Sequence, residues 1–163
     1  MRRVRLKVLL AGLFAACAFG GLAIGIAWAT PGAGVTSTVL AGPMALDEID
    51  IVKQTESHGI ILKTRGEWES RVVHFTVVPG GHFGWHSHPG PVFVTITAGT
   101  LTLVHADGTS VDYPAGTGFV ESGRHVHTAG NAGDVDVQIV AFFLAPKGAA
   151  IRIDEPDPTD DPR

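Results

Sequence analysis

Hydrophobic and polar positions between Leu46 and about Ile153 alternate in short runs that Gly, Pro and Asp residues separate. The runs are rich in Val, Ile, Thr and Phe, which suit the pleated surface of a β-sheet. No segment after residue 30 shows the periodicity of a helix, so the pattern predicts an all-β sandwich or barrel. The predicted strands are Ile49–Lys53, Gly59–Thr64, Arg71–Val78, Val92–Thr97, Thr100–His105, Thr117–Glu121 and Val135–Leu144.

The segments on either side of this region have a different composition. Thr30–Ala45 is rich in Gly, Thr, Ser and Ala and shows little pattern, which is typical of a flexible leader. Asp154–Arg163 contains five acids and three prolines, a composition that favours a disordered tail. We therefore expect one β-barrel domain over residues 46–153. Within it, Ala106-Asp107-Gly108-Thr109 has the composition of a hairpin turn.

The N-terminal 29 residues contain no acid. A basic block over residues 2–7 precedes the uncharged run Val8–Ala29, which ends in Ala27-Trp28-Ala29. This is the layout of a signal peptide, so we expect the protein to be exported. The run of 22 residues is also long enough to span a bilayer, so an uncleaved anchor on the outer side of the cytoplasmic membrane is the alternative. Arg2-Arg3 loosely resembles a twin-arginine export signal.

Charge and cysteine content limit the partners of the exported part. The whole chain carries a formal net charge of −4, and removal of the basic block would leave it near −8. This balance argues against binding to nucleic acid or to an anionic membrane surface. Cys17 is the only cysteine and lies in the apolar run. A metal in the domain must therefore be held by nitrogen and oxygen ligands.

Two histidines follow a Gly-rich turn at Gly80-Gly81. His86 and His88 are two residues apart on a predicted extended segment, so their side chains point to the same face. Imidazole is a ligand that suits Zn, Cu, Fe or Ni. His127 lies about forty residues downstream and is the third candidate ligand. Three histidines that converge inside a β-barrel would hold one divalent transition metal, with Mn as a further candidate.

The spacing around these histidines resembles the first motif of the cupin superfamily. That motif is Gly, five residues, His-x-His, three or four residues, Glu, six residues, Gly. Here Gly80, His86, His88 and Gly99 stand at the matching positions, and Val92 replaces the usual Glu. The resemblance covers roughly residues 46–150 and implies a single-domain jelly-roll barrel. It also makes a homodimer an expected assembly.

The second cupin motif is degenerate and can be placed in two ways. One placement begins at Gly108 and puts Phe119 where the family has His. The other begins at Gly116 and puts His127 and Asn131 at the His and Asn positions. We favour the second placement, because His and Asn have a physical role in the motif. The resemblance then implies His86, His88 and His127 as the metal ligands.

The replacement of Glu by Val92 changes the chemistry that we expect at the metal. Three neutral imidazoles leave a divalent ion with its full charge, which favours an anionic or bidentate substrate or a bound hydroxide. Glu121 precedes His127 by six residues and either restores a carboxylate to the site or lies at the surface. Glu121 and His125 are the candidates for acid–base catalysis.

These observations lead to three hypotheses. The first is an exported, mononuclear metal-binding cupin that acts as a metal-dependent oxygenase on a small, metal-chelating organic molecule. The second is a non-enzymatic module of the cell envelope that binds a small ligand or a metal in the barrel mouth. The third is a structural cupin that has lost the metal, for which Val92 is the best support. A fold alone does not decide among them.

Overall fold

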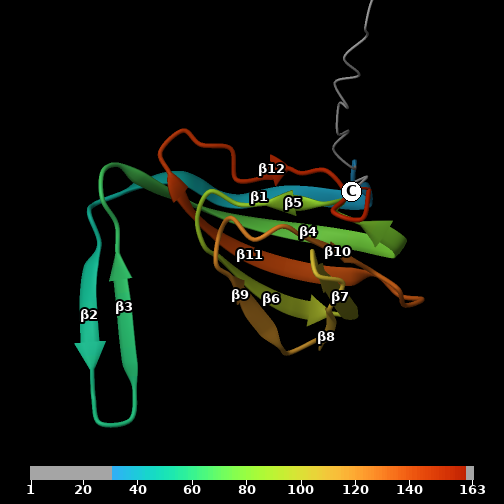
Figure 1. Ribbon diagram of the computed structural model, residues 1–163, viewed down its shortest axis with the longest axis horizontal. Helices are drawn as coiled ribbons and strands as arrows, with labels where there is room; N and C mark the ends of the chain where they lie inside the picture. The colour runs from blue at the N-terminus through green and yellow to red at the C-terminus, as the bar shows by residue number, and fades with distance from the viewer. Residues whose placement is uncertain (1–30, 161–163) are drawn as a thin grey trace, which may run out of the picture.

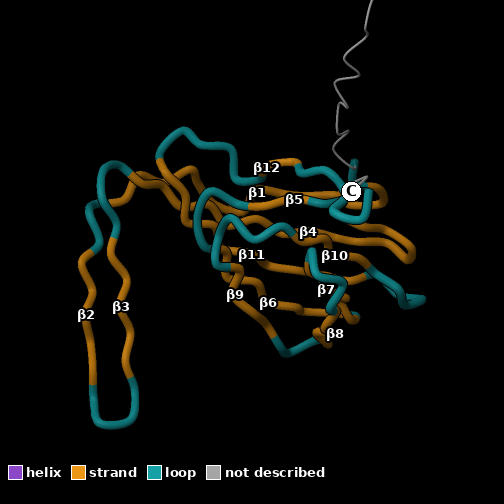
Figure 2. The backbone as a smooth tube through the Cα atoms, viewed as in Figure 1, coloured by secondary structure: helices purple, strands orange, loops and turns teal. Residues whose placement is uncertain are grey.

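The computed structural model describes residues 31–160, and this part of the chain is built from strands and loops without any helix (Figures 1 and 2). No helix in residues 31–160 is therefore long and apolar enough to cross a membrane. The predicted signal or anchor, residues 1–29, lies outside the described residues. The strands are β1 (Ala33–Leu46), β2 (Asp50–Gln54), β3 (Gly59–Lys63), β4 (Trp68–His82), β5 (His86–Ser87), β6 (Val92–Ala98), β7 (Thr100–His105), β8 (Ser110–Pro114), β9 (Gly118–Glu121), β10 (His127–Gly130), β11 (Val137–Pro146) and β12 (Ile153–Asp154).

Ten of the strands form one sheet that curls into a nearly closed barrel (Figure 1). Its main path runs β12-β5-β10-β4-β11-β6-β9, with β1 paired to β4 and β7 paired to β10 and β8. Each of these pairs is antiparallel. The prediction of an all-β, single-domain jelly-roll is confirmed.

The barrel interior follows the two-residue period of its strands. On β4, Val73 and Val77 are buried, and on the neighbouring β11 Val137, Ile139 and Ala141 are buried. Alternate residues of a strand share one face, so these side chains all point inward. Burial of one such side chain contributes about 1.5–3 kcal/mol. The long β4–β11 pair is therefore the rigid part of the barrel against which the shorter strands pack.

The predicted leader is wrong for most of its length. Residues 33–46 form β1, which pairs with β4 along its whole length from Ala33↔His82 to Leu46↔Trp68. The hydrophobic pattern gives no signal for β1 because every residue in it is exposed or only partly buried. Hydrogen bonds to the edge of β4, rather than an apolar face, hold β1 in the sheet.

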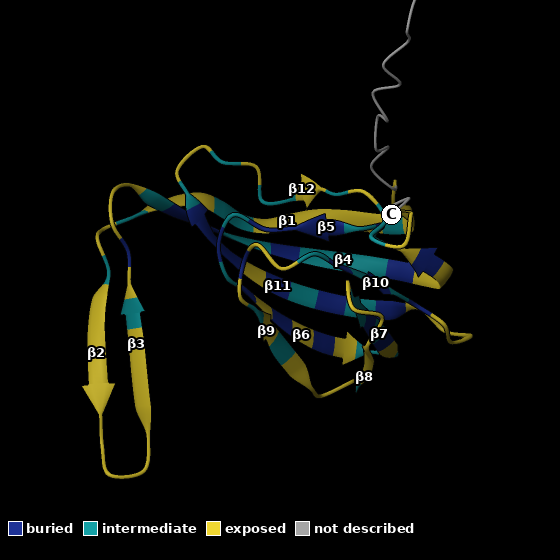
Figure 3. Ribbon diagram, viewed as in Figure 1, coloured by how far each residue is buried: buried dark blue, intermediate teal, exposed yellow. Residues whose placement is uncertain are grey.

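Two further differences concern the ends of the predicted barrel. β2 and β3 form a separate two-stranded sheet that projects from the barrel and is exposed over most of its surface (Figure 3). The predicted disordered tail begins with ordered structure, because Asp154 pairs with His86 and Glu155 accepts a hydrogen bond from Ser87. Residues 161–163 lie outside the described residues. This ordered C-terminal segment becomes one edge of the site described below.

Candidate metal centre

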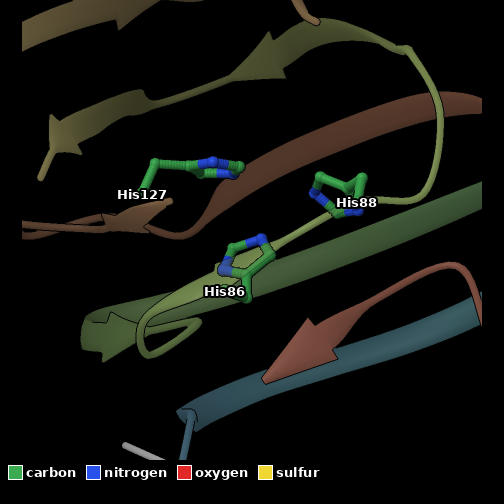
Figure 4. A group of neighbouring side chains, drawn as sticks. All are labelled: His86, His88 and His127. Atoms are coloured by element: carbon green, nitrogen blue, oxygen red, sulfur yellow. The ribbon is translucent and has the colours of Figure 1, made fainter. Parts of the chain in front are cut away.

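Three buried histidines meet at the junction of β5 and β10. His127 pairs directly with His86 across the two strands, and His88 follows on the same face of the chain. One ring nitrogen of each residue lies within 4.8 Å of the others, and Figure 4 shows the rings gathered around a common space. Each residue is at most 5 % exposed. The structure therefore brings together the three histidines that the sequence predicted as ligands.

A backbone carbonyl fixes the orientation of each imidazole. The Nδ1 atoms of His86 and His127 lie 2.9 and 2.8 Å from the carbonyl oxygens of Gly84 and His125. His88 Nδ1 makes the same contact with the carbonyl of Ile151. A carbonyl oxygen can only accept, so each Nδ1 carries the proton and each neutral ring has a bare Nε2. This is the arrangement by which proteins orient histidines that bind a metal.

Glu121 supplies a carboxylate to the same cluster from the neighbouring strand. It lies on β9 directly opposite Val92 of β6, and opposite residues in an antiparallel pair point to the same face. Glu121 Oε2 is 2.9 Å from His88 Nε2, and Oε1 is 3.1 Å from His127 Nε2. The carboxylate that the usual cupin motif takes from β6 is thus present one strand away. We call His86, His88, His127 and Glu121 the polar cluster.

The close contacts of Glu121 require a cation. Because each Nδ1 carries the proton, the lone pair of a neutral Nε2 would face the lone pairs of the carboxylate. A proton or a metal ion between them removes this repulsion. His127 Nε2 is also buried without a well-aligned hydrogen-bond partner, which is costly for a polar atom in the interior. Three imidazole nitrogens and a carboxylate oxygen are a donor set for a divalent transition metal, so the residues present fit such an ion.

The electrostatics of the polar cluster keep His86 and Glu121 in the forms that bind metal and favour a proton on His127. Burial, with the charge of His127, lowers the pKa of His86 to about 3, so this ring is neutral at physiological pH. For Glu121, burial alone would raise the pKa, but the contacts with His127 and His88 outweigh it and lower the pKa to about 2. Burial likewise opposes protonation of His127, but the Glu121 carboxylate raises its pKa overall. Without a metal, the His127–Glu121 pair therefore favours a shared proton.

Comparison with known proteins identifies the barrel. Residues 73–143 match the family model of the cupin domain. The chain belongs to the cupin superfamily. The match includes the whole of the polar cluster and most of the barrel strands.

Other comparisons give weaker likenesses. No curated protein matches the chain. Among solved structures, a cupin domain from Bordetella pertussis is 19 % identical, with a TM-score of 0.48 over 71 % of this chain and 95 % of that one. A cupin superfamily protein from Desulfitobacterium hafniense is 13 % identical, with a TM-score of 0.48 over 68 % and 77 % of the two chains. The polyketide cyclase RemF from Streptomyces resistomycificus is 19 % identical, with a TM-score of 0.46 over 57 % and 69 %.

The polar cluster of this cupin borders a cavity of about 220 Å³ inside the barrel. This volume is below the range of about 300–1,000 Å³ that is usual for sites of drug-sized ligands, so the cavity suits a small molecule. Its polar lining consists of His86, His88, Glu121 and Arg152. The remaining lining residues are Phe75, Phe83, Val92, Val94, Leu101, Phe119, Ala129, Ile139, Ala141, Phe143 and Ile151. A chelating ligand would therefore meet the polar cluster on one side and apolar side chains on the others.

Neither His125 nor Asn131 lines the cavity. The His125 side chain is exposed and does not line the cavity, whereas its carbonyl orients His127. The structure therefore gives no geometric support to His125 as an acid–base group. Asn131 is buried and its Nδ2 donates to the carbonyls of Val77 and Val135, so it fixes the loop before β11 rather than a ligand.

Sequence reasoning missed the C-terminal segment of the cupin. Ile151 provides the carbonyl for His88 and lines the cavity, and Ser87 Oγ donates to Glu155 Oε1 at 2.7 Å. Asp154 pairs with His86, so β12 covers the outer edge of β5. Ile151, Arg152 and Ile153 alternate in polarity, but three residues are too few for a strand signal. The segment therefore became recognisable only through its contacts with β5.

Proposed function

We propose that this protein is an exported, mononuclear metal-binding cupin that acts as a metal-dependent oxygenase on a small, metal-chelating organic molecule. The polar cluster is the observation that carries the proposal. It offers three oriented Nε2 atoms and one carboxylate beside a mostly apolar cavity. His86, His88 and His127 would hold the ion, and Glu121 would lie beside it.

The charge of the polar cluster supports an anionic or chelating substrate. Glu121 is the one acidic residue among the described residues that line the cavity. A divalent ion with one carboxylate and three neutral imidazoles keeps a net positive charge, which stabilises anionic oxygen or sulfur groups of a ligand. A bound metal of this kind supplies open coordination positions and redox chemistry.

The residues of the cavity contribute positioning, exclusion of water and one proton site. The apolar lining limits the space to a small ligand and keeps it out of bulk water. Glu121 contacts two of the imidazoles, so protonation of its carboxylate would change the charge at the ligand-binding face of the cluster. We therefore assign Glu121, and not His125, as the group that can accept or return a proton inside the cavity.

Oxygen consumption by the iron-loaded protein tests this function. The substrates are a panel of β-diketones, catechols and small thiols, with an oxygen electrode and product analysis as readouts. We expect one class to be consumed with uptake of dioxygen by the wild type, and no uptake by His86→Ala. His125→Ala should retain the activity, because its side chain is outside the cavity. Silence of the iron-replete wild type across the panel would contradict the oxygenase assignment.

One observation favours a second function, a non-enzymatic binding module. Apart from Arg152, every ionisable side chain that lines the cavity belongs to the polar cluster in the described part of the chain. A site with no further proton donor can bind a ligand at a metal without converting it. Binding of panel members to the metal-loaded protein, with no dioxygen uptake and no product, would select this function.

Export is a separate part of the proposal and rests on the sequence of residues 1–29. The basic block and the apolar run that follows are typical of a signal peptide. Expression of the full chain in a bacterial host, followed by fractionation and N-terminal sequencing, tests it. We expect a mature protein outside the cytoplasm that begins near Thr30. Recovery of full-length chain from the membrane fraction would select the anchor, and recovery from the cytoplasm would contradict export.

A further inference from the structure

Arg152 is the cation of the cavity. Among the described residues that line the cavity, it is the one Arg or Lys. It also lines a shallow surface depression that contains Gly32, Val35 and Asp154, so it lies where the cavity opens to the outside. Phe83 is the other residue common to both. The Arg152 side chain is 29 % exposed, as expected for a residue at a mouth rather than in the core.

The backbone and one ion pair fix Arg152 close to the polar cluster. It precedes β12, which pairs with β5 through Ile153↔Ser87 and Asp154↔His86. The Arg152 Nε–H donates to Asp154 Oδ1 at 2.5 Å. Its positive charge is near enough to contribute, after burial and other causes, to lowering the pKa of His86. The side chain is therefore held at a fixed place between the cluster and solvent.

Most N–H donors of the Arg152 guanidinium have no hydrogen-bond partner among the described residues. An arginine presents five N–H groups in a planar fork that fits a carboxylate in two parallel hydrogen bonds. In the described part of the chain only Nε has a hydrogen-bond partner, Asp154. The two terminal amino groups are free for a ligand. Phe83 is apolar and the Asp154 carboxylate can only accept, so a ligand anion at the mouth would find its hydrogen bonds at Arg152.

We propose that Arg152 determines specificity by binding the carboxylate of a small organic acid, whose apolar body fills the cavity and whose chelating atoms face the polar cluster. This inference deepens the proposed function and rests on it for the chelating end of the ligand. The carboxylate end rests on the position of Arg152 alone. The substrate class is then a small aromatic or aliphatic acid with a chelating group remote from its carboxylate.

A matched pair of probes tests the proposal in the zinc-loaded full chain. Zinc is used because it has no redox chemistry, so the probes bind without being converted. The probes are 3,4-dihydroxybenzoate and its amide, which share the chelating catechol and differ in the carboxylate. We expect calorimetry to show that the wild type prefers the acid by about 10-fold or more, as one charge-assisted hydrogen-bonded pair implies. Arg152→Gln should remove this preference and leave the affinity for the amide unchanged. Arg152→Lys should retain part of it.

Two controls separate the possible failures. Arg124→Gln changes an exposed arginine that does not line the cavity and should keep the full preference. Benzoate and benzamide are compared in metal-free protein by NMR, because their binding needs no chelation. If the wild type fails to bind zinc, the proposed function fails, and the benzoate preference still decides the role of Arg152. If zinc binds but the wild type shows no preference for the acid, Arg152 does not recognise a carboxylate and the inference is overturned. The inference is also overturned if Arg152→Gln keeps the wild-type preference.

Discussion

The two sides of the cavity are built on opposite principles. The polar cluster consists of Glu121 and of three histidines whose orientations depend on carbonyls of loops and of the C-terminal segment. The facing apolar wall, which we define as Phe75, Val94, Leu101, Ile139 and Ala141, comes from the long alternating strands. The first side therefore depends on a few directed contacts, and the second on the register of a sheet.

This difference assigns function and stability to separate residues. A polar group held in the interior by contacts to other polar groups adds little net stability, because desolvation offsets those contacts. An apolar side chain in a close-packed interior adds stability roughly in proportion to the area that it buries. We therefore expect changes in the polar cluster to alter metal binding, and changes in the apolar wall to alter unfolding.

The largest expected effect is loss of metal from His86→Ala. The variant removes one of three imidazole ligands, and even residues that only orient a ligand change metal affinity by about 10–100-fold. We expect the affinity to fall by more than about 100-fold in a competition titration with a chromophoric chelator. The far-ultraviolet circular dichroism should stay that of the wild type.

His125→Ala is the matched control for His86→Ala. It removes an exposed imidazole and keeps the carbonyl that orients His127. We expect wild-type metal affinity. Equal losses in the two variants would mean that the polar cluster is not the metal site.

Ile139→Ala should give the opposite result. Ile139 is 2 % exposed on β11 and lines the apolar wall. Truncation of such a residue costs about 2–5 kcal/mol, and Ile139→Val about 0.5–1.5 kcal/mol, because the cavity grows with each methylene removed. Urea unfolding of the metal-free protein measures both. The folded variants should bind metal with wild-type stoichiometry, and loss of metal from folded Ile139→Val would contradict the separation of the two sides.

Glu121→Gln should weaken metal binding by about 10–100-fold and change its pH dependence. The Glu121 carboxylate raises the pKa of His127 above its ordinary value, so in the metal-free protein a proton competes with the metal at this ring. Affinity for metal should therefore rise as pH increases through that pKa, with release of the proton. Without the carboxylate the pKa falls, so fewer protons are released at pH 7.

Calorimetry in two buffers of different ionisation enthalpy counts the protons released by wild type and Glu121→Gln. Glu67→Gln is the control, because Glu67 is exposed and pairs with Lys147 away from the cluster. Equal proton release by the wild type and Glu121→Gln would show that Glu121 does not control His127.

The smallest effect should come from the projecting hairpin. Ile61 on β3 is 74 % exposed, and neither β2 nor β3 is paired with the barrel. Ile61→Thr should therefore change the free energy of unfolding by no more than about 0.5 kcal/mol and leave metal affinity unchanged. Thermal unfolding with and without zinc checks both values. A change in metal affinity would show that the hairpin and the polar cluster are energetically coupled, which would contradict their separation.

The sequence predicted β4, β6, β7 and β11, the longer strands that have an apolar face. Thr100–His105 was predicted because its alternating positions reflect burial, and the turn at 106–109 because its residues favour a turn. β1 and β12 were missed, because pairing to β4 and β5 holds them in place without an apolar face. A pattern of buried positions contains no information about such edge strands.

The candidate site shows the same division. His86 and His88 could be predicted because an extended segment places residues two apart on one face. Glu121 could only be left between two interpretations, because its role depends on the register that puts it opposite Val92. Arg152 gave no signal at all, since a single arginine near the end of a chain has no periodicity. The pairing of strands, rather than the residue type, determines the role of Glu121 and the position of Arg152.

An anomalous-difference map of crystals of the zinc-loaded protein shows whether the polar cluster holds the ion. We expect one strong peak inside the barrel, at about 2.0–2.1 Å from the Nε2 atoms of His86, His88 and His127. A Glu121 oxygen should complete the coordination or hydrogen-bond to a ligand of the ion. A zinc-replete protein with no peak among the three histidines, or with its peak elsewhere, would contradict the assignment of the polar cluster as a metal centre.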